Sequence, residues 1–162
     1  MSKTNFEVDK ENLEVRSERI YHASAKRLFE AHTDPKQIVQ WWGPNGLKTV
    51  VETLEVKVGG AWRIVQTDLD GKEHAFRGTF KEIDEPNKIV RTFEYEPMAG
   101  HVLLETVTFE ELPAGTTKQT ATAHYENIDD LNGMVSMGME HGQRQGMERL
   151  AQLVEDKAEA AE

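Results

Sequence analysis

The chain of 162 residues contains no cysteine. This absence excludes disulfide bonds, thiolate metal sites and cysteine nucleophiles. No apolar run approaches the roughly 20 residues that a helix needs to span a bilayer, and residues 1–7 lack the apolar segment of a signal peptide. We therefore expect a cytoplasmic protein without a membrane span.

Positive charge is also scarce. Lysine and arginine total 19 against 29 acidic residues, which gives a formal net charge of −10. Affinity for a phosphate backbone comes from clustered Lys and Arg, so we expect no nucleic-acid partner. The excess acid lies mainly at the two ends and in the turns, as on a solvated surface.

Common catalytic and metal-binding motifs are missing. The histidines at positions 22, 32, 74, 101, 124 and 141 do not have metal-ligand spacing. The sequence has neither a nucleophile elbow nor a phosphate-binding glycine loop. Residues 68–71, Asp-Leu-Asp-Gly, begin like a calcium loop, but the later acidic ligands are absent, so they predict a hairpin turn. We expect no metal and no cofactor.

Strand patterns make up most of the chain. Period-two alternation predicts a first strand over residues 13–21 and six more over residues 49–125. Glycine, proline and Asp-Gly turns separate them at hairpin spacing. We expect residues 1–12 to be a flexible arm and residues 157–162 a flexible tail. A single domain then covers residues 13–156.

Three helices complete the pattern. Ser24 and Asp34 are placed to cap two short helices. The second helix ends at Trp41-Trp42-Gly43-Pro44, where strong helix breakers follow two bulky aromatics. A long amphipathic helix over about residues 129–154 closes the chain, with glycines on or beside its apolar stripe.

The order of these elements predicts an α+β protein with two short helices after the first strand. An antiparallel sheet of about seven strands, apolar on one face, buries that face by curving around the long C-terminal helix. Several inward positions of the last strand carry polar or small residues, where large apolar side chains would be needed to fill the core, namely Gln119, Ala121 and Ala123. We therefore expect an unfilled interior between sheet and helix.

The inward face of the sheet supplies candidate ligand-binding residues. Side chains alternate across a strand, so aromatic and aliphatic residues at every second position line the interior. The tryptophans are expected as walls or lid, and methionines on the closing helix as adaptable lining. Packing of the core is the alternative for each of them. The candidates are Trp41, Trp42, Trp62, Ile64, Phe76, Phe93, Tyr95, Met134, Met139 and Gly142.

Three polar residues share the faces of inward aromatics by the same alternation, namely His74, Arg91 and Glu105. A buried charge is costly unless it is paired, so these groups would either pair with one another or bind the polar end of a ligand. The alternative is a strand register shifted by one, which would place all three in water. They support at most a general acid/base role.

A series of short motifs matches a known family in order and spacing, and together the motifs cover about residues 13–154. The motifs are Thr33-Asp34-Pro35, Trp41-Trp42-Gly43-Pro44, Val58-Gly59-Gly60 with Trp62, Asp70-Gly71, Gly78-Thr79-Phe80-Lys81-Glu82-Ile83, Gly115-Thr116-Thr117 and Gly138-Met139-Glu140-His141-Gly142. In order and spacing the chain resembles the START-like (SRPBCC) superfamily. More narrowly, it resembles homologues of the activator of the heat-shock-protein-90 ATPase.

The resemblance implies a helix-grip fold with a deep apolar cavity between the sheet and the C-terminal helix. It implies no shared catalytic motif. One departure concerns the last helix, where Gln143 stands in place of the aromatic residue that is common in the family.

We therefore expect binding of a small apolar or amphipathic molecule in the interior, by a monomer or weak dimer and without covalent chemistry. One alternative is a cyclase or aldolase type of enzyme that uses Arg91, Glu105 and His74 on a polyketide-like substrate. Another is a chaperone cofactor that acts through its surface.

Overall fold

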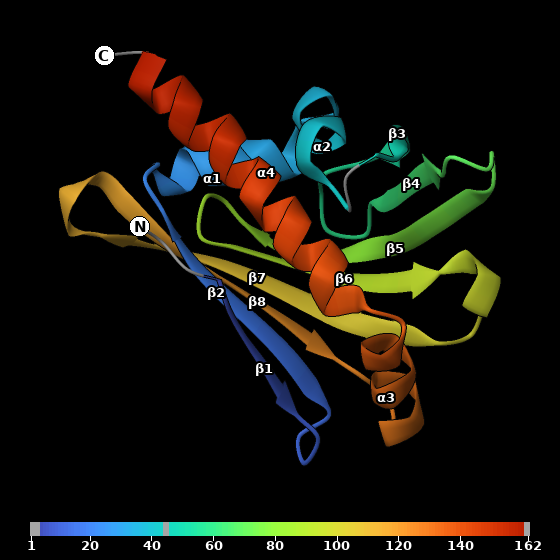
Figure 1. Ribbon diagram of the computed structural model, residues 1–162. Coiled ribbons are helices and arrows are strands. Elements are labelled where there is room, and N and C mark those ends of the chain that lie inside the picture. Colours follow the sequence, from blue (N-terminus) through green and yellow to red (C-terminus); the bar gives the residue numbers. More distant parts are fainter. Residues whose placement is uncertain (1–3, 44–45, 161–162) are drawn as a thin grey trace.

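The computed structural model describes residues 4–43 and 46–160. A single antiparallel sheet of eight strands curves around a long C-terminal helix (Figure 1). The strand order across the sheet is β1-β2-β8-β7-β6-β5-β4-β3. This arrangement confirms the α+β class and the helix-grip fold. The strands are β1 (Asn5–Asp9), β2 (Glu14–Tyr21), β3 (Lys48–Leu54), β4 (Ala61–Thr67), β5 (Glu73–Asp84), β6 (Lys88–Tyr95), β7 (Val102–Leu112) and β8 (Thr116–His124).

β1 differs from the flexible arm expected for residues 1–12. Asn5–Asp9 pairs antiparallel with β2, with Phe6 opposite Ser17. β1 is an edge strand with a partner on one side only, and most of its residues are exposed, so its sequence carries little hydrophobic alternation. The sheet therefore has eight strands rather than about seven, and the short helices follow the second strand.

The two short helices are α1 (Ala25–Thr33) and α2 (Pro35–Trp41). Their predicted caps are confirmed. The backbone N–H of Arg27 donates to the Ser24 hydroxyl over 3.0 Å, and that of Lys36 donates to the Asp34 carboxylate, also over 3.0 Å. Such bonds satisfy amide groups that the first turn of a helix leaves without a partner.

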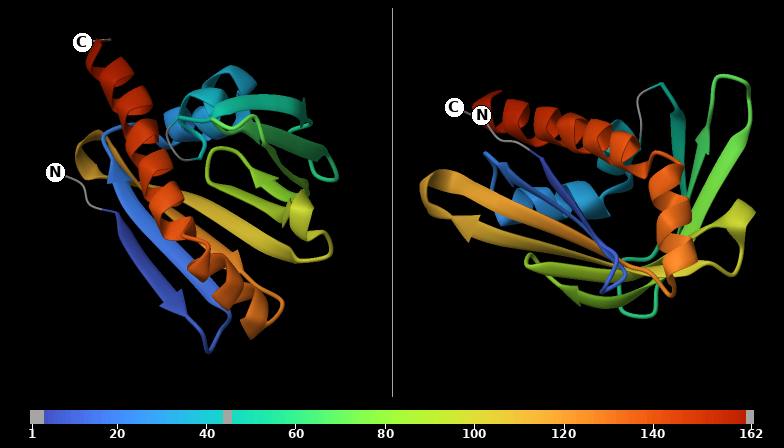
Figure 2. Two further views of the ribbon diagram at one scale, coloured as in Figure 1. Left: turned by 45° about the vertical axis from the view of Figure 1, so that its right-hand side comes forward. Right: turned by 60° about the horizontal axis from the view of Figure 1, so that its bottom comes forward.

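The closing helix consists of two helices, α3 (Ile128–Ser136) and α4 (Met139–Ala160). Gly138 between them has a φ of +82°, a left-handed conformation that ends an α-helix and favours glycine. The expectation of one continuous helix over residues 129–154 is therefore wrong. α4 lies diagonally across the concave side of the sheet, whereas α3 turns away beside the β6–β7 connection (Figures 1 and 2). No helix of the described residues is long and apolar enough to cross a membrane.

Buried side chains form two clusters. The larger joins the sheet to α1, α2 and the C-terminal half of α4, and includes Trp41, Trp62, Phe80, Phe109 and Leu150. The smaller lies beneath α3 and consists of Val15, Leu103, Ala123, Tyr125 and Leu131. Phe93 packs against both clusters but is itself only half-buried. The inner face of the sheet is therefore covered less completely between the clusters than within them.

Candidate ligand-binding site

The tryptophan pair at the end of α2 divides between two environments. Trp41 is 9% exposed, and its indole N–H donates to the carbonyl of Ala31 over 2.9 Å. Trp42 is half-buried, and its ring meets that of Phe76 edge-on at 4.9 Å between centroids. Trp41 thus belongs to the core, whereas Trp42 packs against the aromatic side chains of the sheet.

Trp42 and Gly43, which follow α2, lie between the sheet and α4. The side-chain amide of Gln66, which is buried on β4, donates to the carbonyl of Trp42 over 3.0 Å. Gly43 has a φ of +82°, and a methyl group there would lie 2.1 Å from the Gln66 amide nitrogen. On the other side, a methyl group at Gly146 of α4 would lie 3.2 Å from the Trp41 carbonyl oxygen. The turn therefore has little room to move at these points.

Trp62 of β4 is a large, fully buried side chain on the inner face of the sheet. It is 1% exposed and lies opposite Gly78 of β5 in the ladder. Its indole N–H donates over 3.2 Å to the carbonyl of Thr92 on β6. The Phe93 ring lies 5.5 Å away between centroids, so an aromatic surface continues from β4 onto β6.

An ion pair lies in the middle of this apolar surface. Arg91 of β6 and Glu105 of β7 are directly opposite each other, and the guanidinium Nε donates to the carboxylate over 2.7 Å. The guanidinium carbon also lies 4.4 Å from the centre of the Trp62 ring, a cation–π arrangement. The two side chains keep 13% and 18% of their surface exposed. Mutual pairing and ring stacking let both charges lie on the inner face.

Two polar side chains lie within electrostatic range of this pair, namely His32 and Tyr125. His32 of α1 is hydrogen-bonded to Gln119 of β8 over 3.1 Å, and burial lowers the pKa of His32 to about 4. Tyr125, which follows β8, donates its hydroxyl proton to the sulfur of Met139 over 3.4 Å. Burial raises the pKa of Tyr125, and the charge of Glu105 raises it further. Near pH 7 the imidazole is therefore uncharged and the phenol keeps its proton.

His74 does not join this group. Its Nε2 lies 2.9 Å from the Asp68 carboxylate and its Nδ1 lies 2.6 Å from the Tyr95 hydroxyl. Arg91 pairs opposite Phe80, six residues further along β5, which corresponds to roughly 20 Å of strand. The three polar candidates therefore form two separate sets, the Arg91–Glu105 pair and the Asp68–His74–Tyr95 chain. The hydrogen bond from His74 also holds the pKa of Asp68 below its ordinary value.

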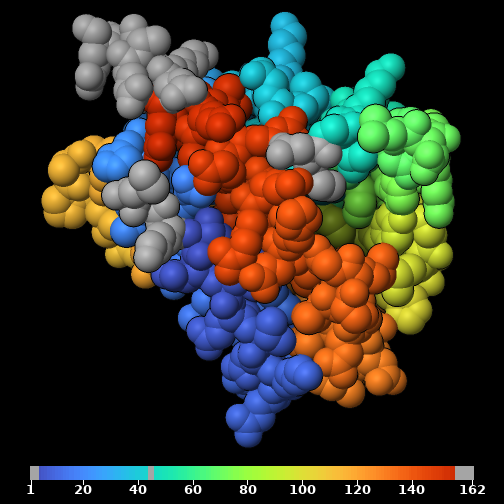
Figure 3. Space-filling view, in the orientation of Figure 1, coloured from blue at the N-terminus to red at the C-terminus, as the bar shows by residue number. Residues whose placement is uncertain are grey.

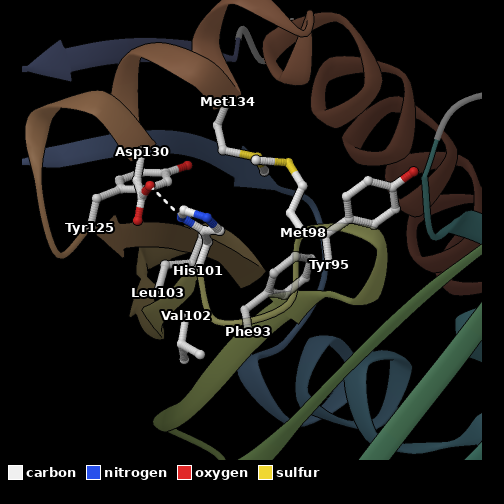
Figure 4. Close-up of a pocket in the computed structure, with 9 residues that line it drawn as sticks. All are labelled: Phe93, Tyr95, Met98, His101, Val102, Leu103, Tyr125, Asp130 and Met134. Carbon is white, nitrogen blue, oxygen red and sulfur yellow. Dashed lines mark hydrogen bonds and ion pairs between the residues drawn. The ribbon is translucent and has the colours of Figure 1, made fainter.

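A pocket opens between α3 and the connected ends of β6 and β7 (Figure 4). Its enclosed volume is about 20 Å³, room for about one water molecule. His101 and Asp130 close one side through a 2.6 Å contact between ring nitrogen and carboxylate. The side chains of Met98 and Met134 extend toward each other across the pocket (Figure 4). The lining residues are Phe93, Tyr95, Met98, His101, Val102, Leu103, Tyr125, Asp130 and Met134.

The pocket and the ion pair lie in successive rows of the inner face. Phe93 and Leu103, which line the pocket, are opposite each other on β6 and β7. Arg91 and Glu105 lie two residues further along the same strands, a separation of roughly 7 Å at the usual strand rise. The pair therefore lies one row of side chains beyond Phe93 and Leu103 on the same face of the sheet.

The candidates named from sequence have different places in the structure. Phe93, Tyr95 and Met134 line the pocket, and Met139 contacts the hydroxyl of Tyr125. The core includes Trp41, Trp62 and Ile64, and the last two are each 1% exposed. Phe76 stacks on Tyr95 at 5.1 Å, and Gly142 is half-buried on α4. In the space-filling view the yellow-green strands are visible in a recess between α3–α4 and the green β4–β5 hairpin (Figure 3).

Sequence reasoning missed several residues of the site. Met98 and His101 lie in the β6–β7 connection, which has no periodicity to orient a side chain. Tyr125 follows β8 and continues the period-two alternation of Ala123, so its inward orientation could have been predicted from the sequence. His32 lies one turn after Leu28 on the apolar stripe of α1, which marks a helical face but does not name its partner. Among the described residues, no group of three or more His, Asp or Glu could hold a metal ion.

Comparison with known proteins gives a family match over most of the chain. Residues 22–155 match the family described as Activator of Hsp90 ATPase homolog 1-like protein. No curated protein matches the chain.

Several solved structures share the fold. Protein Ms6760 from Mycobacterium smegmatis is similar with a TM-score of 0.85 and 21% identity, over 94% of this chain and 97% of that one. A protein from Arthrobacter aurescens has a TM-score of 0.87 and 27% identity, over 94% and 91% of the two chains. An HSP90 activator from Plasmodium falciparum has a TM-score of 0.55 and 23% identity, over 70% and 73%. The chain belongs to the Activator of Hsp90 ATPase homolog 1-like protein family, within the START-like superfamily.

Proposed function

We propose that the protein binds a small apolar or amphipathic molecule between the sheet and helices α3 and α4. The apolar part of the ligand contacts the half-buried rings of Phe76, Phe93 and Tyr95. Its polar end reaches toward Arg91 and Glu105. Binding occurs by burial, without covalent chemistry.

The ion pair on the apolar inner face carries this proposal. A guanidinium has five N–H donors and a carboxylate about four acceptor sites. Within the described part of the chain, the hydrogen bond from Nε of Arg91 to Glu105 uses one of these donors and one of these acceptors. Their remaining polar atoms are not among the buried atoms without a partner, so solvent reaches them. These donors and acceptors are available to a ligand.

Entry of a ligand requires the pocket to enlarge, because its present volume matches about one water molecule. Two features support such a change. Met98 and Met134 line the pocket, and methionine side chains repack at low cost. α3 and α4 are separate helices joined through Gly138, which has a left-handed conformation, and we propose that α3 shifts about this glycine while α4 stays in place.

The first experiment is native mass spectrometry of the protein purified from its own host. Co-purification of a small molecule of defined mass is the expected result. Titration with a broad panel of fatty acids, alcohols and sterols, followed by tryptophan fluorescence, extends the search. A protein that is free of ligand and gives no response to the panel would count against the proposal.

A matched pair of variants locates the site. Met134→Trp fills the pocket and is expected to abolish binding of the ligand found. Met137→Trp, three residues away, adds the same bulk to a side chain that is 59% exposed and is expected to leave the dissociation constant unchanged. Equal affinity of both variants, measured by calorimetry, would place the ligand elsewhere.

A second candidate is a role as a chaperone cofactor, supported by the family description and by the fold shared with an HSP90 activator. It predicts that the purified protein raises the ATPase rate of the chaperone from the same host and co-purifies with it. We do not extend the proposal to an enzyme that uses Arg91, Glu105 and His74 together, because His74 lies apart from the other two.

A further inference from the structure

The polar centre of the proposed site has no net charge. Arg91 and Glu105 are paired over 2.7 Å, so the positive and negative charges cancel within one contact. Each charge lies on an apolar face, and removing either one would leave the other there without its partner, which is costly. The pair therefore acts on a ligand as a dipole rather than as a cation or an anion.

The neighbours of the pair that the structure describes on the other elements are uncharged near pH 7. From α1, His32 is uncharged near pH 7, because burial lowers its pKa to about 4. After β8, Tyr125 is a neutral phenol, because burial raises its pKa. β4 and β5 contribute Trp62 and Phe80, and α4 contributes Met139 beside the phenol. None of these side chains would compensate an additional charge brought by a ligand.

The available hydrogen-bonding groups suit a neutral polar end. The spare N–H groups of Arg91 need an acceptor and the spare oxygen of Glu105 needs a donor. A hydroxyl group provides both, and a carbonyl provides the acceptor. A carboxylate or phosphate accepts only, and it would place a second negative charge near Glu105. An ammonium group donates only, and it would meet the guanidinium of Arg91.

We infer that the ligand is a neutral amphipathic molecule whose hydroxyl or carbonyl group lies against the Arg91–Glu105 pair, and that anionic and cationic amphiphiles of the same length are rejected. This inference rests on the proposed ligand-binding function and names its ligand class.

Wild-type protein tests the inference with three probes that share one chain length, namely 1-octanol, octanoate and octylamine. Dissociation constants are measured by calorimetry at pH 7.5, where octanoate is anionic and octylamine cationic. We expect 1-octanol to bind at least tenfold more tightly than either ion. Equal or tighter binding of octanoate or octylamine overturns the inference and leaves the binding function standing. Failure of 1-octanol to bind also overturns the inference, whereas the binding function is decided separately by native mass spectrometry and the broad ligand panel.

Charge variants give a second, independent readout. Glu105→Gln leaves the positive charge of Arg91 unpaired, and its preference is expected to shift at least tenfold toward octanoate. Arg91→Gln is expected to shift the preference toward octylamine. The double variant R91Q/E105Q is neutral again and is expected to keep the preference for 1-octanol, and it remains testable if a single variant fails to fold.

The control pair lies outside the site. Glu94 on β6 is bonded to Arg77 on β5 over 3.0 Å, and Arg77 is 52% exposed. Glu94→Gln is expected to leave the order of the three probes unchanged. A folded Glu105→Gln variant, verified by circular dichroism and melting temperature, that keeps the wild-type order would overturn the inference.

Discussion

Trp62 lies directly opposite Gly78 in the β4–β5 ladder, and the missing side chain of the glycine lets the indole N–H reach the carbonyl of Thr92 on the next strand. A methyl group at Gly78 would stand 1.9 Å from that carbonyl oxygen and 2.6 Å from the indole nitrogen. The aromatic surface that supports Arg91 thus depends on a residue without a side chain.

Gly78→Ala is therefore expected to lower the free energy of unfolding by about 1–3 kcal/mol, because the obstacle is backbone and cannot move aside. The control is Gly133→Ala in α3, where a methyl group would meet nothing within 4 Å. That variant is expected to be neutral or to gain up to about 1 kcal/mol from helix propensity. Urea denaturation measures both. Equal stability of the two variants would contradict the packing described at Gly78.

Gln66→Ala is expected to destabilise the turn after α2. The Gln66 side chain is 2% exposed and donates to the Trp42 carbonyl, so its removal leaves a carbonyl without this partner, at a cost of about 1–3 kcal/mol. Gln40→Ala is the control, because the Gln40 side chain is exposed and bonds only within its own helix. Chemical denaturation gives the stability change. A red shift of tryptophan emission in Gln66→Ala alone would report the exposure of Trp42.

His32 makes stability depend on pH in the acid range. Its pKa falls from 6.5 to about 4 on folding because of burial, so the unfolded chain binds the extra proton between these values. The stability that the folded state owes to an uncharged His32 is fully present above pH 6.5. It is lost as the pH falls toward 4. Its full size is at most about 3 kcal/mol, and we expect less because the ring is only half-buried.

The measurement compares wild type with His32→Gln between pH 6.5 and 5, where most carboxylates are still ionised in both proteins. The wild type is expected to lose more stability over this interval than the variant. An NMR titration of the His32 ring gives the pKa directly. Parallel stability profiles for the two proteins, or a His32 ring that titrates near 6.5, would refute the assigned burial.

His101→Ala is expected to loosen α3 without unfolding the protein. The contact of His101 with Asp130 joins α3 to the β6–β7 connection, but His101 is 52% exposed, so global stability should change by less than about 1 kcal/mol. Hydrogen exchange followed by mass spectrometry should become faster in residues 128–136 and stay unchanged in β7. His124→Ala, which removes another exposed histidine contact, should leave exchange in α3 as in the wild type.

Much of the fold could be predicted from the sequence because its signals are local. Asp-Gly and Pro turns bound the hairpins from β4 to β8, and Ser24 and Asp34 cap their helices as predicted. Two features of the fold were not predicted from the sequence. β1 carries little alternation because it is an exposed edge strand, and the helical stripe continues across Gly138, whose left-handed φ breaks the helix.

The site was less predictable, because its partners come from distant segments. Strand alternation orients Arg91 and Glu105, yet their contact depends on the β6–β7 register. His74 shares the alternation, but the hydrogen bond to Asp68 depends on the fold of the hairpin turn between them. The sequence marks Asp68 only as a turn residue. Residues of the β6–β7 connection, such as His101, have no periodic signal at all.

The break at Gly138 divides the C-terminal segment into two helices that pack in different core clusters. Leu150, Ala151 and Val154 of α4 belong to the larger core cluster, whereas α3 contributes Leu131 to the smaller one. Substitutions in α3 that reshape the pocket therefore leave the main core untouched. Under the proposed binding function, ligand preference can therefore diverge through changes in a nine-residue helix while the rest of the chain continues to fold in the same way.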